Sequence, residues 1–211
     1  MAYVSRHDVW MPYQLNEATL TKRISICESL QKRLENDPFL ERMVTGDENW
    51  FVYNDVTREI IWGHSSDLPL IPWKVGLHPK KIMLFVWWDF KGIIYHELLP
   101  SELARRKGVV FHHGNARSHK SLTTQNKLFQ LGWDILPHPP YSPDLSPTSY
   151  HIFRPLRDSM EEKTFNDEEA IKNHVDWFFA NKCQIFYESG ITMLETKWQM
   201  VIDKNGHCIS Y

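Results

Sequence analysis

The sequence predicts an α/β fold in which a mixed β-sheet is flanked by helices. Between residues 42 and 136, apolar residues gather mainly in short strand-like runs separated by turn residues. Helical patterns alternate with the last of these runs and dominate after residue 148. Strands that first form a meander and then alternate with helices are typical of one sheet covered by helices. A length of 211 residues, 42% of them hydrophobic, suits one domain of ordinary size.

The first 41 residues predict an extended arm followed by a helix. The arm, Val9–Leu15, is short, aromatic and interrupted by Pro12. From Asn16 to Glu35, apolar residues recur at steps of three and four, which predicts a helix with one apolar stripe. We therefore divide the chain into a linker arm and helix at residues 1–41 and a main domain at residues 42–211.

The remaining elements follow from periodicity and turn signals. The predicted strands are Met43–Tyr53, Glu59–Trp62, Ile82–Trp88, Ile93–Leu99, Val109–His113 and Asp134–Leu136. The predicted helices are His119–Leu131, Thr148–Glu162, Asp167–Ala180 and one within the last thirty residues. Lys91-Gly92 predicts a hairpin turn, and the acidic residues from Asp167 suit a helix N-terminus. An RNase H-like fold has this order of elements, as do other mixed sheets.

Composition limits the classes of function. No apolar run reaches eighteen residues, and the first eight residues lack the apolar stretch of a secretory signal, so we expect a soluble intracellular protein without a membrane partner. The scattered cysteines Cys27, Cys183 and Cys208 predict reduced thiols rather than a disulfide framework or a cysteine zinc site. A net charge of −2 is unusual for a DNA-binding protein, so any DNA contact must be local. Short basic groups such as Lys80-Lys81 are, taken alone, usually solvated surface charge.

Two acidic residues lie within the predicted strand Met43–Tyr53. Strand alternation points Asp47 and Glu48 to opposite faces, so only one of them can easily face a site. A carboxylate in such a strand is costly to desolvate unless a cation or hydrogen-bond donors meet it. The sequence leaves two interpretations open: a site residue, or a structural acid in a salt bridge at the sheet edge.

Polar residues follow two predicted strands at the point where each strand ends. His112, His113 and His119 come at or after Val109–His113, and His138 follows Asp134–Leu136, which is where α/β sheets build their sites. These histidines do not form the helical pair of zinc hydrolases, so a histidine metal site is disfavoured. The loop 137–147 is stiffened by prolines, which predicts either a structural turn or a rigid support for a neighbouring side chain.

Several motifs in order resemble mariner-type DNA transposases, from the interdomain linker to the C-terminus. They are Trp10–Leu15, Val44–Trp50, Val86–Trp88, His113–His119 and His138–Pro147. The resemblance implies an RNase H-like fold and an ancestral enzyme that cut and joined transposon-end DNA with two divalent ions, Mg²⁺ or Mn²⁺. It also implies DNA as a partner and a nuclear location, and we hypothesise a homodimer formed through the Trp10–Leu15 arm.

In this family three aspartates hold the ions. By resemblance, Asp47 occupies the first position and is the predicted remaining catalytic and metal-binding residue. The second position is Gly114 and the third is Ser149, and the family spacing of thirty-four residues between them is preserved by Asn115 to Thr148. The candidate DNA contacts are Lys80, Lys81, Arg105, Arg106 and Arg117.

These two replacements argue against catalysis. Mg²⁺ prefers charged oxygen ligands, whereas glycine offers no side chain and serine a neutral hydroxyl. If each lost carboxylate weakens transition-state stabilisation by roughly 3–4 kcal/mol, the rate falls by about two to three decades per site. We expect no rescue from Glu48, which should point away from Asp47, or from Asp144, which should cap or brace the proline-rich loop. Ser146-Pro147 predicts a helix N-cap that places Ser149 in the first turn.

The chain departs from the family elsewhere too. Only Pro100–Gly108 joins two predicted strands where the family has a long helical crossover, and nine residues reach at most roughly 30 Å. This shortened crossover after the third core strand predicts an under-packed or exposed sheet face. We also expect no N-terminal helix-turn-helix module for sequence-specific DNA binding.

The leading hypothesis is a transposase-derived domain that is largely or wholly inactive and retains residual DNA binding. Two alternatives stay open: a weakly active metal-dependent DNA endonuclease centred on Asp47, and a relic with no selected function. Enzymatic activity is therefore undecided by the sequence.

Overall fold

The computed structural model describes residues 15–53, 80–96, 108–116, 119–161, 163–165 and 167–209. The predicted strand Glu59–Trp62, nearly all of the predicted arm and nearly all of the short crossover lie outside these residues. The hypothesis that the arm forms a dimer contact therefore stays a prediction.

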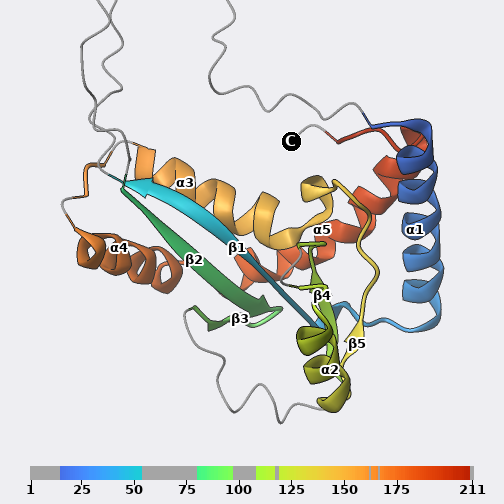
Figure 1. The fold of residues 1–211 in the computed structure, drawn as a ribbon, viewed down its shortest axis with the longest axis horizontal. Helices are drawn as coiled ribbons and strands as arrows, with labels where there is room; N and C mark the ends of the chain where they lie inside the picture. Colours follow the sequence, from blue (N-terminus) through green and yellow to red (C-terminus); the bar gives the residue numbers. More distant parts are fainter. Residues whose placement is uncertain are drawn as a thin grey trace, which may run out of the picture.

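The described strands form one mixed sheet in the order β3-β2-β1-β4-β5 (Figure 1). They are β1 Met43–Tyr53, β2 Lys80–Asp89, β3 Gly92–Tyr95, β4 Val110–His113 and β5 Asp134–Ile135. β2 pairs antiparallel with β1 and β3, whereas β4 pairs parallel with β1 and β5. The predicted hairpin is confirmed, and Asp89 closes it by accepting hydrogen bonds from Lys91 N and Gly92 N at 2.8 and 3.2 Å.

Helices flank this sheet, as predicted. They are α1 Glu17–Asn36, α2 Leu122–Gln130, α3 Arg154–Glu161, α4 Glu168–Ala180 and α5 Gln184–Asp203, with short 3₁₀ turns η1 Leu40–Arg42 and η3 Pro143–Leu145 and a π-helical segment η4 Thr148–Phe153. Three of the helices begin at a polar N-cap residue whose side chain accepts a hydrogen bond from the backbone N–H three residues later. These N-cap residues are Asn16, Ser121 and Asp167. Among the described residues, no helix combines the length and apolar character needed to cross a membrane.

One prediction about a helix start is wrong in its details. The predicted helix from Thr148 begins as π-helix and becomes α-helix only at Arg154. Ser146 does not cap it with its side chain, and its backbone carbonyl instead accepts from Ser149 N and Tyr150 N, each at 3.0 Å. Ser149 nevertheless lies in the first turn, as predicted. π-Helical turns are frequent at functional sites.

The sheet has two differently covered faces. The face that includes Met43, Val86 and Trp88 belongs to the main core, together with buried residues of α1, α3, α4 and α5. Figure 1 shows α3 and α5 along one side of the sheet, with α1 beside α5. The opposite face packs Val44 and Phe111 against Leu128 of α2 and its neighbour Trp133.

That second face is only partly covered. Trp50 and Phe85 lie on it, and they are 48% and 41% exposed. Trp87 is half-buried there and stacks on Phe111, with ring centroids 4.9 Å apart. Large apolar side chains therefore remain partly exposed on this face among the described residues. The prediction of a face left under-packed by the short crossover stays a prediction, because nearly all of the crossover lies outside those residues.

A buried ion pair joins α1, the proline-rich loop and the C-terminal segment. Arg23 is fully buried and donates to Asp144 Oδ1 and Oδ2 at 3.0 and 2.7 Å, and to Gly206 O at 2.8 Å. Arg23 also donates to Ser142 Oγ. Asp144 Oδ2 further accepts from Ile209 N at 3.0 Å. Asp144 therefore braces the loop as expected, but its partners lie far away in the sequence.

Removing one partner of this pair should destabilise the fold strongly. Asp144→Asn leaves the Arg23 guanidinium buried without a counter-charge, which costs about 3–5 kcal/mol of unfolding free energy. Denaturant unfolding monitored by tryptophan fluorescence measures this loss.

The matched control is Asp134→Asn, which removes an exposed ion pair with Arg33 and should cost at most about 1 kcal/mol. The double variant Arg23→Met/Asp144→Leu should be more stable than Asp144→Asn, because no uncompensated charge remains. Equal losses in Asp144→Asn and Asp134→Asn would contradict the role of the pair.

Candidate metal and cleavage site

The candidate site lies where β4 ends beside the longer strand β1. β4 pairs with β1 only from Met43 to Gly46, and its last residue, His113, lies opposite Gly46. From Asp47 onward this edge of β1 has no β-strand partner among the described residues. Side chains from both faces of β1 can therefore approach one another around this open edge.

Asp47 lies on the face of β1 that looks toward η4. Its Oδ1 accepts from Glu48 N at 3.0 Å and its Oδ2 accepts from the Ser149 hydroxyl at 3.1 Å. Burial raises the pKa of Asp47 above its ordinary value, and these two donors oppose that rise. Both Asp47 oxygens are thus engaged by neutral protein donors, one of which is Ser149, the residue predicted for the third metal position.

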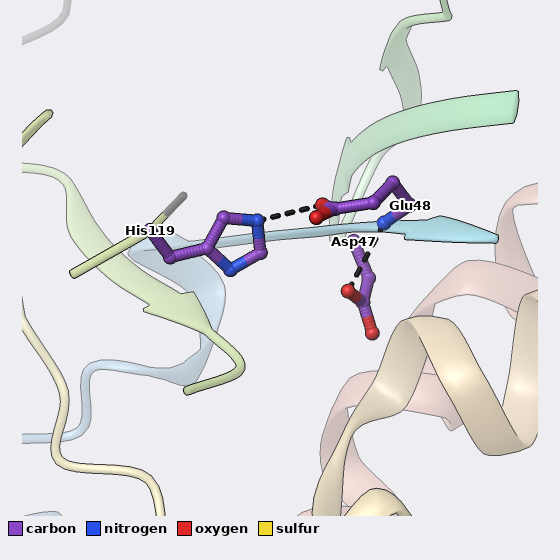
Figure 2. A group of neighbouring side chains, drawn as sticks. All are labelled: Asp47, Glu48 and His119. Carbon is purple, nitrogen blue, oxygen red and sulfur yellow. Dashed lines mark hydrogen bonds and ion pairs between the residues drawn. The ribbon is translucent and has the colours of Figure 1, made fainter. Parts of the chain in front are cut away.

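Glu48 points to the opposite face, as strand alternation predicts. Its Oε2 lies 2.6 Å from His119 Nε2, and both side chains are partly exposed. The hydrogen bond to Glu48 raises the pKa of His119, which favours the imidazolium at this contact. Figure 2 shows the His119 ring facing Glu48, while the Asp47 carboxylate lies on the other side of the β1 ribbon.

Glu48 points away from the face of Asp47, as expected, but its carboxylate still lies near that of Asp47 at the edge of β1. One ligand atom each from Asp47, Glu48 and His119 lie within 4.8 Å of one another. The two carboxylates leave β1 on opposite faces but meet at the open edge beyond β4. The sequence named His119 as a polar residue at a strand end but did not predict its contact with Glu48, because the two residues are 71 positions apart.

Gly114, the residue predicted for the second metal position, has no side chain, but its backbone carbonyl is a hydrogen-bond acceptor. Its carbonyl accepts from His113 Nδ1 at 2.7 Å and from His119 Nδ1 at 3.2 Å. A Cβ placed on Gly114 would meet no atom within 4 Å. The next residue, Asn115, donates to the carbonyls of His138 and Pro139 at 2.8 and 3.2 Å, which ties the end of β4 to the proline-rich loop.

A second histidine pair, the buried His112 and the half-buried His138, lies beneath the site. His112 Nδ1 contacts Thr45 Oγ1 and His112 Nε2 contacts His138 Nδ1, both at 3.1 Å. Burial lowers the pKa of His112 well below its ordinary value and lowers that of His138 to about 4. These rings are neutral at physiological pH and link β1, β4 and the proline-rich loop.

The structure places few of the candidate DNA contacts. Lys80 and Lys81 are the first two residues of β2. Arg105, Arg106 and Arg117 lie outside the described residues. The assignment of these cations to DNA therefore stays a prediction.

Comparison with known proteins agrees with this geometry. Residues 52–113 match the family model of a transposase with a partial DDE domain. The chain is 33% identical to the Mariner Mos1 transposase of Drosophila mauritiana over 98% of its own length and 67% of that protein. It is also 36% identical to the human histone-lysine N-methyltransferase SETMAR, covering 96% of this chain but 33% of that protein.

The chain belongs to the mariner transposase family. Its fold matches the crystal structure of the catalytic domain of Mos1 mariner transposase with a TM-score of 0.78, at 32% identity over 95% of this chain and all of that one. It matches the pre-cleavage Mos1 transpososome with a TM-score of 0.81, at 32% identity over all of this chain and 69% of that one. The RNase H-like fold is therefore confirmed.

Solved structures of Mos1 also bear on the predicted divalent metal cofactor and on the predicted DNA partner. The Mos1 catalytic domain has been solved with Mn and with Mg, so divalent metals are used in the family. Mos1 transposase has further been solved as a paired-end complex with the left transposon end. In the mariner domain described here, the residues at the three predicted metal positions do not fit a two-ion Mg²⁺ centre, because only Asp47 among Asp47, Gly114 and Ser149 offers a carboxylate.

The histidine pair beneath the site predicts a pH-dependent stability. Below about pH 6.5 the unfolded chain binds a proton at His138, but the folded protein does so only near pH 4. The free energy of unfolding should therefore fall as pH falls through this window, by about 3 kcal/mol in all for His138. Urea unfolding at pH 7.5 and pH 5.0 measures the effect.

His138→Asn should reduce this pH dependence, whatever its effect on stability at pH 7.5. The exposed His207 provides the control, because His207→Asn should leave the pH dependence intact. An unchanged slope in His138→Asn would show that this pair is not responsible.

Proposed function

We propose that this mariner-derived domain binds DNA but does not cut it at an appreciable rate. One observation carries the proposal: both oxygens of Asp47 are engaged by protein donors, and the donor from η4 is Ser149, at the position of a family metal ligand. The former two-metal centre is reduced to a single carboxylate that already has hydrogen-bond partners.

The loss of catalysis follows from electrostatics. Two divalent ions held close together repel each other, and several carboxylates are needed to offset that repulsion. Gly114 contributes no charge, and Ser149 contributes only a hydroxyl that donates to Asp47. We expect the reaction to be slowed by about two to three decades for each missing carboxylate.

The proposal of DNA binding rests on the retained family fold. Mos1, whose catalytic domain has the same fold, has been solved with transposon-end DNA. The net charge of −2 argues against a long basic surface as the source of affinity, so binding should be local and weak. We propose the Lys80-Lys81 pair, Arg105, Arg106 and Arg117 as the local contacts, and the nucleus as the location in which DNA is met.

Restoring the two family carboxylates should restore cleavage. Gly114 has room for a side chain, and Ser149 already lies 3.1 Å from Asp47, so Gly114→Asp/Ser149→Asp should rebuild the acidic cluster. We expect nicking of supercoiled DNA with Mg²⁺ or Mn²⁺ to rise by at least about 100-fold over the unaltered protein.

The control for this gain is the triple variant that also carries Asp47→Ala, in which nicking should vanish. Thermal unfolding of each variant verifies that the fold persists. Nicking by the unaltered protein that disappears in Asp47→Ala would overturn the proposal in favour of a weakly active endonuclease.

DNA affinity should depend steeply on salt. Neutralising Z phosphates on duplex DNA gives a slope of about −0.9 Z for log K against log salt concentration. Fluorescence anisotropy with a labelled duplex between about 50 and 200 mM NaCl measures this dependence. For three to four phosphate contacts, that slope predicts an affinity loss of about 40- to 150-fold over this range.

Lys80→Gln/Lys81→Gln should make this slope shallower by about two units if both lysines contact phosphates. Lys204→Gln, a change at an exposed lysine after α5, serves as the control. Undetectable or salt-insensitive binding would remove the DNA-binding proposal while leaving the loss of cleavage untouched.

A further inference from the structure

The cluster at the open edge of β1 has the composition of a different kind of metal site. Asp47, Glu48 and His119 each present one ligand atom, and these atoms lie within 4.8 Å of one another. Of the three residues, only Asp47 occupies a family metal position. An imidazole nitrogen among the donors changes the class of ion that the cluster suits, because imidazole favours Zn²⁺, Co²⁺ or Ni²⁺ over Mg²⁺.

A second observation sets the tautomer and orientation of the His119 ring. A carbonyl oxygen can only accept, so the contact of His119 Nδ1 with Gly114 O at 3.2 Å places a proton on Nδ1. Metal-binding histidines almost always donate their other ring N–H to a carbonyl or carboxylate in this way. His119 Nε2 is thereby directed at the Glu48 carboxylate, in the orientation that a shared ion requires (Figure 2).

His113 supports the same arrangement. Its Nδ1 donates to the same Gly114 carbonyl at 2.7 Å, and its ring packs edge-on against His119 with centroids 5.2 Å apart. The backbone of Gly114 therefore holds two imidazoles at the place where the family has a carboxylate. This orientation is built by the end of β4 and does not depend on the side chain that was lost.

We propose that Asp47, Glu48 and His119 bind a single Zn²⁺-class ion in place of the family's Mg²⁺ pair. Ligand atoms around tetrahedral Zn²⁺ are separated by roughly 3.4 Å, so small side-chain rotations bring the three donors into range. The ion replaces the proton shared by His119 and Glu48, and that proton is released to solvent. Glu48 and His119 are 22% and 18% exposed at their side chains, which leaves a path for the ion and a position for water.

Cobalt spectroscopy tests the site directly, without DNA and without any activity. Metal-stripped full-length protein is titrated with Co²⁺, and the visible d–d absorption reports ligand number and geometry. One equivalent of Co²⁺ should bind and be displaced by one equivalent of Zn²⁺, while Mg²⁺ in large excess should not displace it. Absence of a sulfur-to-cobalt charge-transfer band separates this site from binding at the exposed Cys183.

Two variants identify the ligands. His119→Gln and Glu48→Gln should each weaken Zn²⁺ binding by at least about 100-fold in competition titrations, since loss of even an outer partner costs about 10–100-fold. The exposed His207 gives the matched control, and His207→Gln should bind as the unaltered protein does.

This experiment tests metal binding separately from the proposed DNA-binding function, because no DNA is present. Failure to bind Co²⁺, displacement by Mg²⁺, or unchanged binding in His119→Gln would each overturn it. Circular dichroism and thermal unfolding of the variants separate a lost ligand from a lost fold.

Discussion

The buried contact between Arg23 and Asp144 is the interaction on which the arrangement of the site depends. The bidentate pair holds the proline-rich loop against α1, and Ile209 N adds the C-terminal segment to the same carboxylate. That loop leads directly into η4, so it sets where Ser149 meets Asp47. A buried guanidinium and carboxylate must stay together, because separating them leaves an unpaired buried charge, which lowers the free energy of unfolding. The loop is rigid through this pair as much as through its prolines.

The second constraint is the difference in length between β1 and β4. Because β4 stops opposite Gly46, residues 47 and 48 leave a paired region and enter an open edge. The side chains of Asp47 and Glu48 leave β1 on opposite faces of the sheet. Their carboxylates nevertheless approach each other at this edge, because no neighbouring strand separates them there among the described residues. The same edge brings in His119 from the segment after β4. One short strand thus explains both the exposure and the composition of the cluster.

The fold and the ancestral chemistry have separate requirements. The mariner architecture depends on the core around Trp88 and on the histidine and ion-pair contacts beneath the site, none of which uses a side chain at position 114. Trp88 Nε1 donates to Thr148 Oγ1 at 3.0 Å, which anchors the start of η4 without reference to the residue that follows. The scaffold can therefore persist without carboxylates at positions 114 and 149, the two predicted metal positions. What remains is a set of oxygen and nitrogen donors that favours another class of ion.

The sequence by itself determined the mixed sheet, its hairpin and the acidic start of α4 at Asp167, because periodicity and turn chemistry depend on neighbouring residues. The metal positions assigned to Asp47, Gly114 and Ser149 stay a prediction. Strand alternation also placed Asp47 and Glu48 correctly on opposite faces. Only the tertiary structure decided which distant side chains meet: His119 with Glu48, 71 residues apart, and Arg23 with Asp144, 121 residues apart. The physical reason is that such contacts depend on strand pairing and helix packing, and above all on where β4 ends beside β1.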